Sequence, residues 1–317
     1  MADMKILETL SIGELRAELA AREAKAKGAL AIPAGASLKH VDDASLVDFL
    51  RSQQKVIYGA DDRKDLYELP QDDRMKSSAD SVVALFQAGN VKDEGDGTSS
   101  LFTSNFGVSR NLCPQERFRD QPVGAFCTGF LVAPDIIATA GHCVNAANVQ
   151  DVRFVFGFEM LGPTSPRLNV GNNEIYRGAE LIGREQVGTG PDWALVRLDR
   201  QVTNHPVLAI RKTGKIGKDQ QLYVIGHPSG LPKKVAAGAA VRNNDAAGFF
   251  VANTDTYGGN SGSPVFNSGD HVVEGILVRG ETDFVQQGNC YVSLVCPAAG
   301  CRGEDCTRTT VFSSLIP

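Results

Sequence analysis

The sequence predicts an all-β protein preceded by a helical segment, and two observations lead to this fold class. From Ser81 onward, apolar residues occur in short runs separated by Gly, Pro, Asn and Asp, which is the pattern of many short strands. Before residue 56 the apolar residues instead recur at helical spacing, and this period is nearly lost downstream. The strand pattern fits a sandwich as well as a barrel, and periodicity does not choose between them.

Residues 1–55 are expected to form helices joined by a linker. Ser11 can cap a first helix of about residues 12–27, because Glu14 occupies the capping-box position three residues later. A stretch with Gly and Pro then breaks the helical period, and a second short helix is expected after it. The chain therefore divides into a helical segment, 1–55, and a strand-rich region, 56–317.

The strands are expected where short apolar runs lie between turn residues. No internal repeat or low-complexity tract interrupts this pattern. The acidic stretch 92–97 lacks the ligand spacing of a known calcium loop, and we expect a solvated turn there. The expected strands are residues 81–87, 129–133, 136–139, 152–158, 193–198, 222–226, 249–252, 264–266 and 272–278.

Length and composition exclude several classes of function. A chain of 317 residues with 42% hydrophobic content is long enough for two cored units plus an appendage and should be soluble and globular. A net charge of -5 with 32 basic residues leaves no basic face for nucleic acid. No apolar run approaches the roughly 20 residues that span a bilayer, and the first residues lack the plan of a signal peptide. We expect neither a nucleic-acid nor a membrane partner.

Seven cysteines indicate an oxidising compartment. Four of them crowd between residues 290 and 306, in segments with Gly, Pro and charge, which favours disulfides that staple loops over buried thiols. The alternative is a zinc site, but the spacing lacks the paired Cys-x2-Cys arrangement of common zinc sites. An odd count leaves at least one thiol unpaired within the chain. The pairing stays open for Cys113, Cys290, Cys296, Cys301 and Cys306.

Three segments offer the side chains that catalysis by a serine requires. A serine hydroxyl needs an imidazole to accept its proton and a carboxylate to orient that imidazole. Among five histidines, His142 stands apart because it ends a strand-like run beside Cys143. With Asp192 and Ser261 it forms a candidate catalytic triad. The remaining histidines are expected in surface or turn positions: His40, His205, His227 and His271.

Around these candidates the chain carries three motifs in a fixed order. They read Thr139-Ala140-Gly141-His142-Cys143, Asp192-Trp193-Ala194-Leu195-Val196 and Gly259-Asn260-Ser261-Gly262-Ser263-Pro264. They resemble the signatures of the chymotrypsin-like serine proteases, closest to the bacterial branch that contains the glutamyl endopeptidases, over about residues 56–290. The order His, Asp, Ser is that of this family and not of subtilisins or α/β-hydrolases.

The resemblance implies a fold and a class of activity. The fold would be two antiparallel six-stranded β-barrels with the active site between them, in residues 56–317, preceded by a helical pro-segment. The activity would be hydrolysis of protein or peptide substrates by a serine endopeptidase. The family works without a cofactor or metal, and we expect a monomer.

The resemblance also assigns a role to each candidate residue. Ser261 would be the nucleophile, His142 the general base and then acid, and Asp192 its orienting carboxylate. The backbone N–H groups of Gly259 and Ser261 would form the oxyanion hole, because glycine lets the peptide turn its N–H toward the substrate oxygen. A flexible turn is the alternative for this glycine. The family's disulfide beside the histidine would join Cys127 and Cys143.

Substrate preference should depend on the loop before the nucleophile. Asp255 lies where the trypsin-like members carry the carboxylate that pairs with Lys or Arg, and Thr256 follows it in the expected pocket. A turn aspartate is the alternative, because Tyr257 replaces the cysteine that sets this loop in trypsin. Leu277 stands where the glutamyl endopeptidases carry a histidine, whereas Arg279 could attract an acidic substrate, neutralise Asp255 or simply be solvated. We expect cleavage after Lys or Arg, with cleavage after Glu or Asp as the alternative.

The junction after the helical segment resembles a processing site. Cleavage between Lys55 and Val56 would release residues 1–55 from a zymogen and would suit an enzyme selective for basic residues. Asn260 stands where trypsin has the aspartate that receives the new amino terminus, which separates this chain from that activation mechanism. The alternatives are a permanent helical module and, in another class of function, a protease-fold protein that binds without cutting. We expect a secreted or periplasmic protein, although no signal peptide is visible in this chain.

Overall fold

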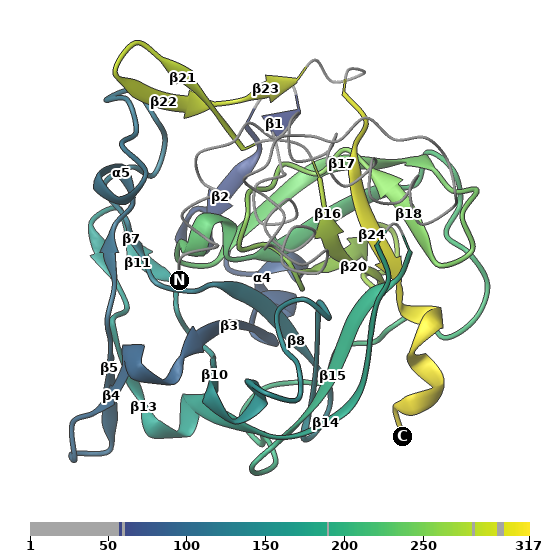
Figure 1. The fold of residues 1–317 in the computed structure, drawn as a ribbon, viewed down its shortest axis with the longest axis horizontal. Coiled ribbons are helices and arrows are strands. Elements are labelled where there is room, and N and C mark those ends of the chain that lie inside the picture. The colour runs from purple at the N-terminus through teal and green to yellow at the C-terminus, as the bar shows by residue number, and fades with distance from the viewer. Residues whose placement is uncertain (1–56, 59–60, 189, 281–282, 297–300) are drawn as a thin grey trace, which may run out of the picture. The chain divides into compact units, whose positions relative to one another are not determined.

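The computed structural model describes residues 57–58, 61–188, 190–280, 283–296 and 301–317. The helices expected within residues 1–55, His40, and the processing site at Lys55 and Val56 lie outside these residues. The described part is mostly β, with two closed barrels of six antiparallel strands each (Figure 1). The expected all-β class and its two-barrel architecture are thereby confirmed.

The first barrel carries long apolar runs because both faces of its strands are covered. All seven residues of β8 (Cys127–Ala133) are buried, so the strand shows no alternation of polar and apolar residues. Its strands pair in the order β10 (Val152–Val155), β14 (Ile175–Gln186), β15 (Asp192–Leu198), β9 (Ile136–Thr139), β8 and β3 (Val82–Gln87), and β3 returns to β10.

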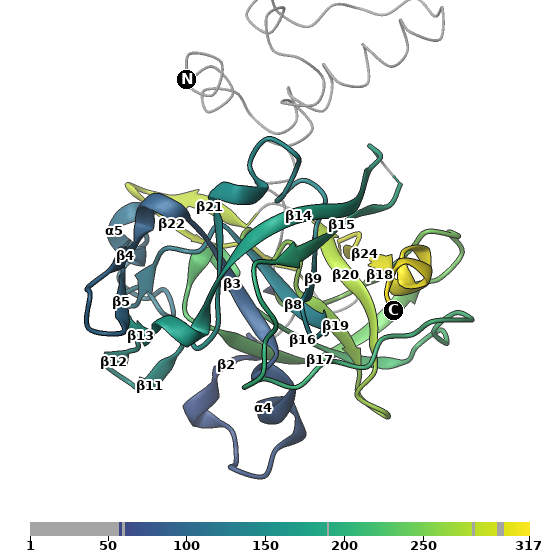
Figure 2. The same ribbon diagram turned by 90° about the horizontal axis from the view of Figure 1, so that it is seen from below.

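The second barrel follows in the chain. Its strands pair in the order β16 (Gln221–Gly226), β19 (Pro264–Asn267), β20 (Val273–Arg279), β24 (Glu304–Arg308), β18 (Phe249–Ala252) and β17 (Lys234–Asn243), and β17 closes the barrel on β16. An additional strand, β2 (Arg63–Asp65), runs antiparallel to β17, and Figure 2 shows the two side by side. The chain thus reaches the second barrel first at β2, before it builds the first barrel.

Shorter elements extend from the barrels. The acidic stretch 92–97 lies in an exposed hairpin turn, as expected. Among the described residues, no helix is long and apolar enough to cross a membrane. The helices are α4 (Arg74–Ala79) and α5 (Phe106–Ser109), and the paired short strands are β1 (Ile57–Tyr58) with β23 (Val295–Cys296), β4 (Val91–Asp93) with β5 (Thr98–Leu101), β5 with β13 (Asn169–Gly171), β6 (Ser104–Asn105) with β7 (Pro122–Val123), β11 (Met160–Gly162) with β12 (Ser165–Pro166), and β21 (Phe284–Gln287) with β22 (Cys290–Ser293).

One hydrophobic cluster is shared by the two barrels. It contains Phe130 and Leu195 of the first barrel together with Ile225 and Ile276 of the second, all fully buried. A smaller cluster around Phe250 fills the second barrel. Because burial of apolar surface contributes about 25 cal/mol per Å², the shared cluster holds the barrels together and fixes the loops that meet between them.

Three barrel strands are missing from the expectation based on the sequence, each for a physical reason. β14 contains charged residues and two register shifts, which break the alternation of a strand. β17 is rich in Ala and Gly, whose β propensity is low. β24 reads Glu-Asp-Cys-Thr-Arg, yet all five residues are buried. Its charges are compensated inside the protein, since Arg308 binds the carbonyl oxygens of Asn244 and Ala246, and Asp305 binds Arg279.

The cysteines form three disulfides. Cys306, expected in a stapled loop, is instead a buried thiol within β24, where the strand places it in the core of the second barrel. The zinc alternative for the C-terminal cysteines is wrong, because the other three of them are consumed by disulfides. The bonds are Cys113–Cys290, Cys127–Cys143 and Cys296–Cys301.

A half-buried histidine, His205, makes the stability of the first barrel depend on pH. His205 stacks on Phe156 with ring centroids 4.0 Å apart and forms ion pairs with Asp80 at 3.1 Å and Glu174 at 2.7 Å. Burial lowers the pKa of His205, but the hydrogen bonds and charges of the two carboxylates outweigh burial and raise it to about 9, from 6.5.

We therefore expect the His205 ion pairs to stabilise the fold fully below pH 6.5 and to lose this contribution as the pH rises through about 9. The substitution His205→Gln should cost stability at pH 6 and much less at pH 9.5. Urea unfolding of both proteins across this range measures the difference. A difference that does not change with pH would contradict the assignment.

Candidate active site

The first barrel brings His142 and Asp192 together. His142 follows β9 and Asp192 begins β15, and these strands pair side by side. The His142 Nδ1 lies 2.8 Å from Asp192 Oδ2, and the His142 backbone N–H donates to Asp192 Oδ1 at 3.1 Å. Asp192 is fully buried, and its own N–H donates to the Thr307 hydroxyl at 3.0 Å. Asp192 is therefore fixed through its backbone, and both of its carboxylate oxygens orient His142.

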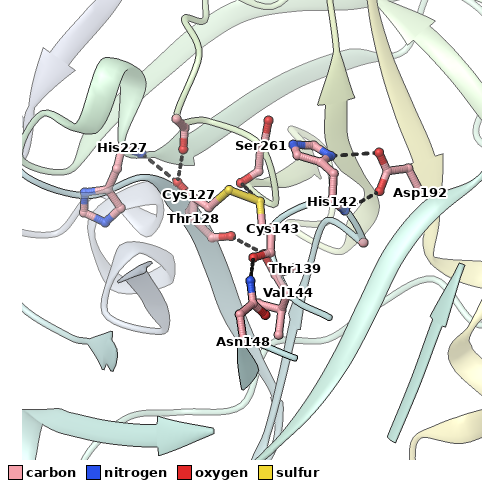
Figure 3. The surroundings of a disulfide bond; sticks show 12 residues. Cys127, Thr128, Thr139, His142, Cys143, Val144, Asn148, Asp192, His227 and Ser261 are labelled. Carbon is pink, nitrogen blue, oxygen red and sulfur yellow. Dashed lines mark hydrogen bonds and ion pairs between the residues drawn. A yellow bond between two sulfur atoms is a disulfide. The ribbon is translucent and has the colours of Figure 1, made fainter. Parts of the chain in front are cut away.

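Ser261 reaches the same place from the second barrel. It lies in the loop between β18 and β19, and its carbonyl oxygen accepts the Thr128 N–H of β8 at 2.9 Å. Figure 3 shows the Ser261 side chain beside the imidazole of His142, on the side of the ring away from Asp192. The disulfide between Cys127 and Cys143 lies directly under this group (Figure 3). The arrangement suits transfer of a proton from a serine hydroxyl to an imidazole.

The loop before Ser261 is held by its carbonyl groups. The Gly258 carbonyl accepts the Ser229 N–H, and the Gly259 carbonyl accepts the Thr128 hydroxyl at 3.0 Å. A trans peptide directs its C=O and the following N–H to opposite sides, so the Gly259 N–H points away from Ser229. Gly259 has a φ of +86°, and a Cβ there would lie 2.7 Å from the His227 carbonyl oxygen, so only glycine fits. The flexible-turn alternative for this glycine does not describe so constrained a position.

His227 packs directly behind this loop. It was expected at the surface or in a turn; it caps a short turn at Pro228–Gly230 but is fully buried. Burial, together with the charge of Lys233, holds the pKa of His227 well below its usual range. The imidazole is therefore neutral and packs against Phe158, with ring centroids 5.7 Å apart.

Asp255 is buried and bound by the backbone of an earlier segment. Its Oδ1 accepts the Tyr58 N–H at 2.6 Å, and its Oδ2 accepts the Asp62 N–H at 2.9 Å. Burial raises the pKa of Asp255 to about 6, and the two N–H groups moderate that rise. The carboxylate thus joins the loop of the nucleophile to the residues that follow the expected processing site, and it is ionised at neutral pH.

The other expected pocket residues have different surroundings. Thr256 is fully buried, and its hydroxyl has no hydrogen-bond partner among the described residues. Leu277 is fully buried, and its backbone pairs with Gly262 at 2.8 Å and Ser263 at 3.0 Å, which places it beside the nucleophile loop. Arg279 is not solvated, as one alternative had it. Its Nε donates to Asp305 Oδ2 at 3.0 Å.

Arg279 anchors the loop that precedes β15. Its guanidinium donates to the carbonyl oxygens of Gly188 at 2.7 Å and Gly190 at 2.6 Å. The side chain is only 7% exposed, so its donors are occupied inside the protein. An arginine bound in this way is poorly placed to receive the acidic side chain of a substrate.

Three residues at the site carry no signal in the sequence motifs. Thr128 follows Cys127 but belongs to none of the three motifs, and Ser229 has a left-handed φ of +52° that no sequence pattern indicates. Glu304 begins β24, is fully buried, and has its carboxylate against Gly280, where a Cβ would overlap it. Glu304 thus adds a second carboxylate beside the expected pocket wall, and a search for acidic residues near the last cysteine would have found it.

The described residues offer little to a metal ion. Their one cluster of potential ligands is Cys127, His142 and Cys143, with ligand atoms within 4.8 Å of one another. Both sulfur atoms of this cluster are bonded to each other in the disulfide. Thiolates are the form that binds zinc, so the cluster is not a metal site as it stands.

The free energy of unfolding of a Gly259 variant can test the constraint on this residue. Gly259→Ala places a Cβ at a positive φ and against the His227 carbonyl, and we expect a loss of about 2 to 4 kcal/mol. Gly95 has a similar φ of +80° with nothing within 4 Å, so Gly95→Ala is the matched control and should cost only about 1 kcal/mol. Denaturant unfolding measures both, and equal losses would show that the contact with His227 contributes nothing.

One family model and several solved structures are similar to this chain. The family model described as "Trypsin-like peptidase domain" matches residues 127–276. A search of the curated proteins found no match. One similar solved structure is a Glu endopeptidase in complex with MPD, at 17% identity and a TM-score of 0.48, over 82% of this chain and 97% of that one. The VesB protease of Vibrio cholerae is 15% identical with a TM-score of 0.48, over 83% of this chain and 67% of that one. A serine endoprotease from Yersinia pestis is 15% identical with a TM-score of 0.45, over 76% of this chain and 65% of that one. The chain therefore contains a trypsin-like peptidase domain, and residues 127–276 belong to that family.

Proposed function

We propose that this trypsin-like serine peptidase is an endopeptidase that uses His142, Asp192 and Ser261 as its catalytic triad. The observation that carries the proposal is the 2.8 Å contact between His142 and the fully buried Asp192, with the Ser261 side chain on the other side of the ring (Figure 3). This order of carboxylate, imidazole and hydroxyl is what activation of a serine requires.

The first half of the reaction forms an acyl-enzyme. Asp192 accepts the Nδ1–H of His142, which leaves Nε2 free to take the proton of the Ser261 hydroxyl as Oγ attacks the scissile carbonyl carbon. The tetrahedral intermediate then collapses, and His142 gives this proton to the departing amine. The peptide bond breaks, and the acyl group remains on Ser261 Oγ.

The second half uses water in place of the serine hydroxyl. His142 takes a proton from water, which attacks the ester carbonyl, and then returns the proton to Ser261 Oγ. In both halves the negative oxygen of the intermediate would be bound by the N–H groups of Gly259 and Ser261. The orientation of the Gly258–Gly259 peptide supports this role, because its N–H faces away from the bond to Ser229.

Activity should depend on the Ser261 hydroxyl, and removing that hydroxyl should leave the fold nearly unchanged. Ser261→Ala is expected to lower kcat by about a million-fold while the thermal unfolding curve stays near that of the wild type. Hydrolysis of unstructured protein substrates by both forms measures the loss. Equal cleavage by both forms would exclude Ser261 as the nucleophile. A wild type that cleaves no peptide would support a protease-fold protein that binds without cutting.

For primary specificity we propose cleavage after Lys or Arg. Two buried carboxylates, Asp255 and Glu304, support a basic substrate side chain, and Asp255 keeps further lone pairs beyond those used by backbone N–H groups. Cleavage after Glu or Asp would need a free cation, and Arg279 is already bound to Asp305 and to backbone carbonyls.

Peptides that differ only in the residue before the scissile bond test this specificity. We expect kcat/KM for Lys and Arg to exceed that for Glu by at least about 100-fold. Asp255→Asn and Glu304→Gln should each lower this ratio, whereas Asp96→Asn, on the exposed hairpin, should leave it unchanged. A preference for Glu in the wild type would refute the proposal.

We also propose that residues 1–55 are a pro-segment removed by cleavage after Lys55, as a selectivity for basic residues would allow. The segment just downstream is built into the peptidase, since Tyr58 and Asp62 are bound by Asp255. Three disulfides support a secreted or periplasmic location. The same Ser261→Ala protein tests processing by N-terminal sequencing. A start at Val56 in the wild type alone is expected, and a start at residue 1 in fully active enzyme would remove the pro-segment.

A further inference from the structure

We propose that the Thr128 hydroxyl is a positioning group for the oxyanion hole. It would hold the Gly259 carbonyl, while the Ser229 N–H holds the Gly258 carbonyl, so that the loop is set without an ion pair at Asn260. The inference rests on the proposed function, because it concerns the loop that would bind the negative oxygen.

The backbone N–H, the backbone carbonyl and the side-chain hydroxyl of Thr128 all form hydrogen bonds. It is fully buried in β8, its N–H donates to the Ser261 carbonyl at 2.9 Å, and its own carbonyl accepts the Thr139 hydroxyl at 2.7 Å. Its Oγ1 accepts the His227 N–H at 3.0 Å and lies 3.0 Å from the Gly259 carbonyl oxygen. One residue of the first barrel thus contacts both Gly259 and Ser261.

The direction of the hydroxyl hydrogen follows from its two partners. The His227 backbone N–H can only donate, and the Gly259 carbonyl can only accept. The Thr128 hydroxyl therefore accepts from the first and donates to the second, with no alternative arrangement among these groups. A side chain with a methyl group in place of this hydroxyl would leave one buried donor and one buried acceptor without their bond.

The two held carbonyls define the orientation of the loop. Gly258 C=O points to Ser229 and Gly259 C=O points to Thr128, so the N–H groups of Gly259 and Asn260 point to the opposite sides of their peptides. The Asn260 N–H is used within the turn, where it donates to Tyr257 at 3.1 Å. The Ser229 bond thus sets the direction of the Gly259 N–H. The Thr128 bond fixes the next peptide, so Gly259 is held on both sides and its N–H cannot turn independently.

Because Asn260 carries no charge, the loop cannot be held by an ion pair between this residue and an amino terminus. Its amide is neutral and buried, and its Oδ1 accepts the Ser263 hydroxyl at 3.2 Å, so it offers no charge that could bind an amino terminus. The Ser229 backbone lies at a left-handed φ of +52°, a conformation that costs a non-glycine residue free energy and that the surrounding structure must maintain. Thr128 and Ser229 together replace what a buried ion pair would do for this loop.

The test compares single-hydroxyl variants in the active enzyme. Thr128→Val keeps the shape and removes the hydroxyl, whereas Thr128→Ser keeps the hydroxyl. We expect Thr128→Val to lower kcat about 10- to 100-fold with KM nearly unchanged, because misdirecting an oxyanion donor affects the transition state more than the bound substrate. Thr128→Ser should stay within about threefold of the wild type.

A second pair of variants and a binding measurement distinguish an effect on the orientation of the loop from an effect on stability. Thr128→Ala differs from Thr128→Ser by the hydroxyl alone and replaces Thr128→Val should that variant fail to fold. Binding of a peptide aldehyde, which forms the tetrahedral adduct, should weaken in the hydroxyl-free variant in parallel with kcat, while binding of a cleaved product peptide should not. Loss of both in proportion to thermal stability would overturn the proposal.

The remaining outcomes are also decisive. Equal kcat in the variants with and without the hydroxyl would show that it does not position the loop. An inactive wild type would instead refute the proposed function. These failures are distinguishable, because the first requires an active wild type and the second excludes it.

Discussion

The contact between β8 and the loop of Ser261 is the interaction on which the candidate site depends. His142 and Asp192 belong to the first barrel, whereas Ser261 belongs to the second, so their relative position is decided by how the barrels pack. The shared hydrophobic cluster stabilises the packing of the barrels, but hydrophobic contacts are non-directional and do not set an exact orientation. The hydrogen bond from Thr128 to the Ser261 carbonyl, at 2.9 Å, adds the directional constraint at the point where accuracy matters.

A second constraint acts at the other end of the same loop. Arg63 is 2% exposed, binds Asp61 at 2.8 Å, donates to the Tyr257 hydroxyl at 3.0 Å and stacks on the Tyr257 ring at 3.9 Å. The Tyr257 hydroxyl also bonds the Ser293 hydroxyl. Hydrogen bonds and a cation over an aromatic ring therefore hold this loop at Tyr257.

The sequence was sufficient for the parts of the fold and site that depend on local patterns. Apolar runs identify β3, β8, β9 and β15 because both faces of these strands are buried. The spacing and order of three motifs identify His142, Asp192 and Ser261 as candidates. β14 was not predicted because its bulges break the alternation of polar and apolar residues. β24 was not predicted because its residues are polar, and their partners are distant in the chain.

The surroundings of the site were harder to predict for the same reason. Asp255 has the position of a pocket carboxylate, but nothing near it in the sequence indicates that Tyr58 and Asp62 would bind it. Arg279 binds Asp305 and the carbonyl oxygens of Gly188 and Gly190, which are brought to it only by the fold. Such pairings join residues far apart in the chain, and no local sequence pattern indicates them.

The disulfide beside the site has a consequence for where the enzyme can work. Cys127 and Cys143 lie 16 residues apart, and a bond closing a loop of that length stabilises a fold by about 3 kcal/mol. Its two ends directly adjoin Thr128 and His142, so reduction would loosen His142 and the anchor of the Ser261 loop at the same time. The thiol redox state of the surroundings therefore acts on the candidate site itself, and reducing conditions would weaken it.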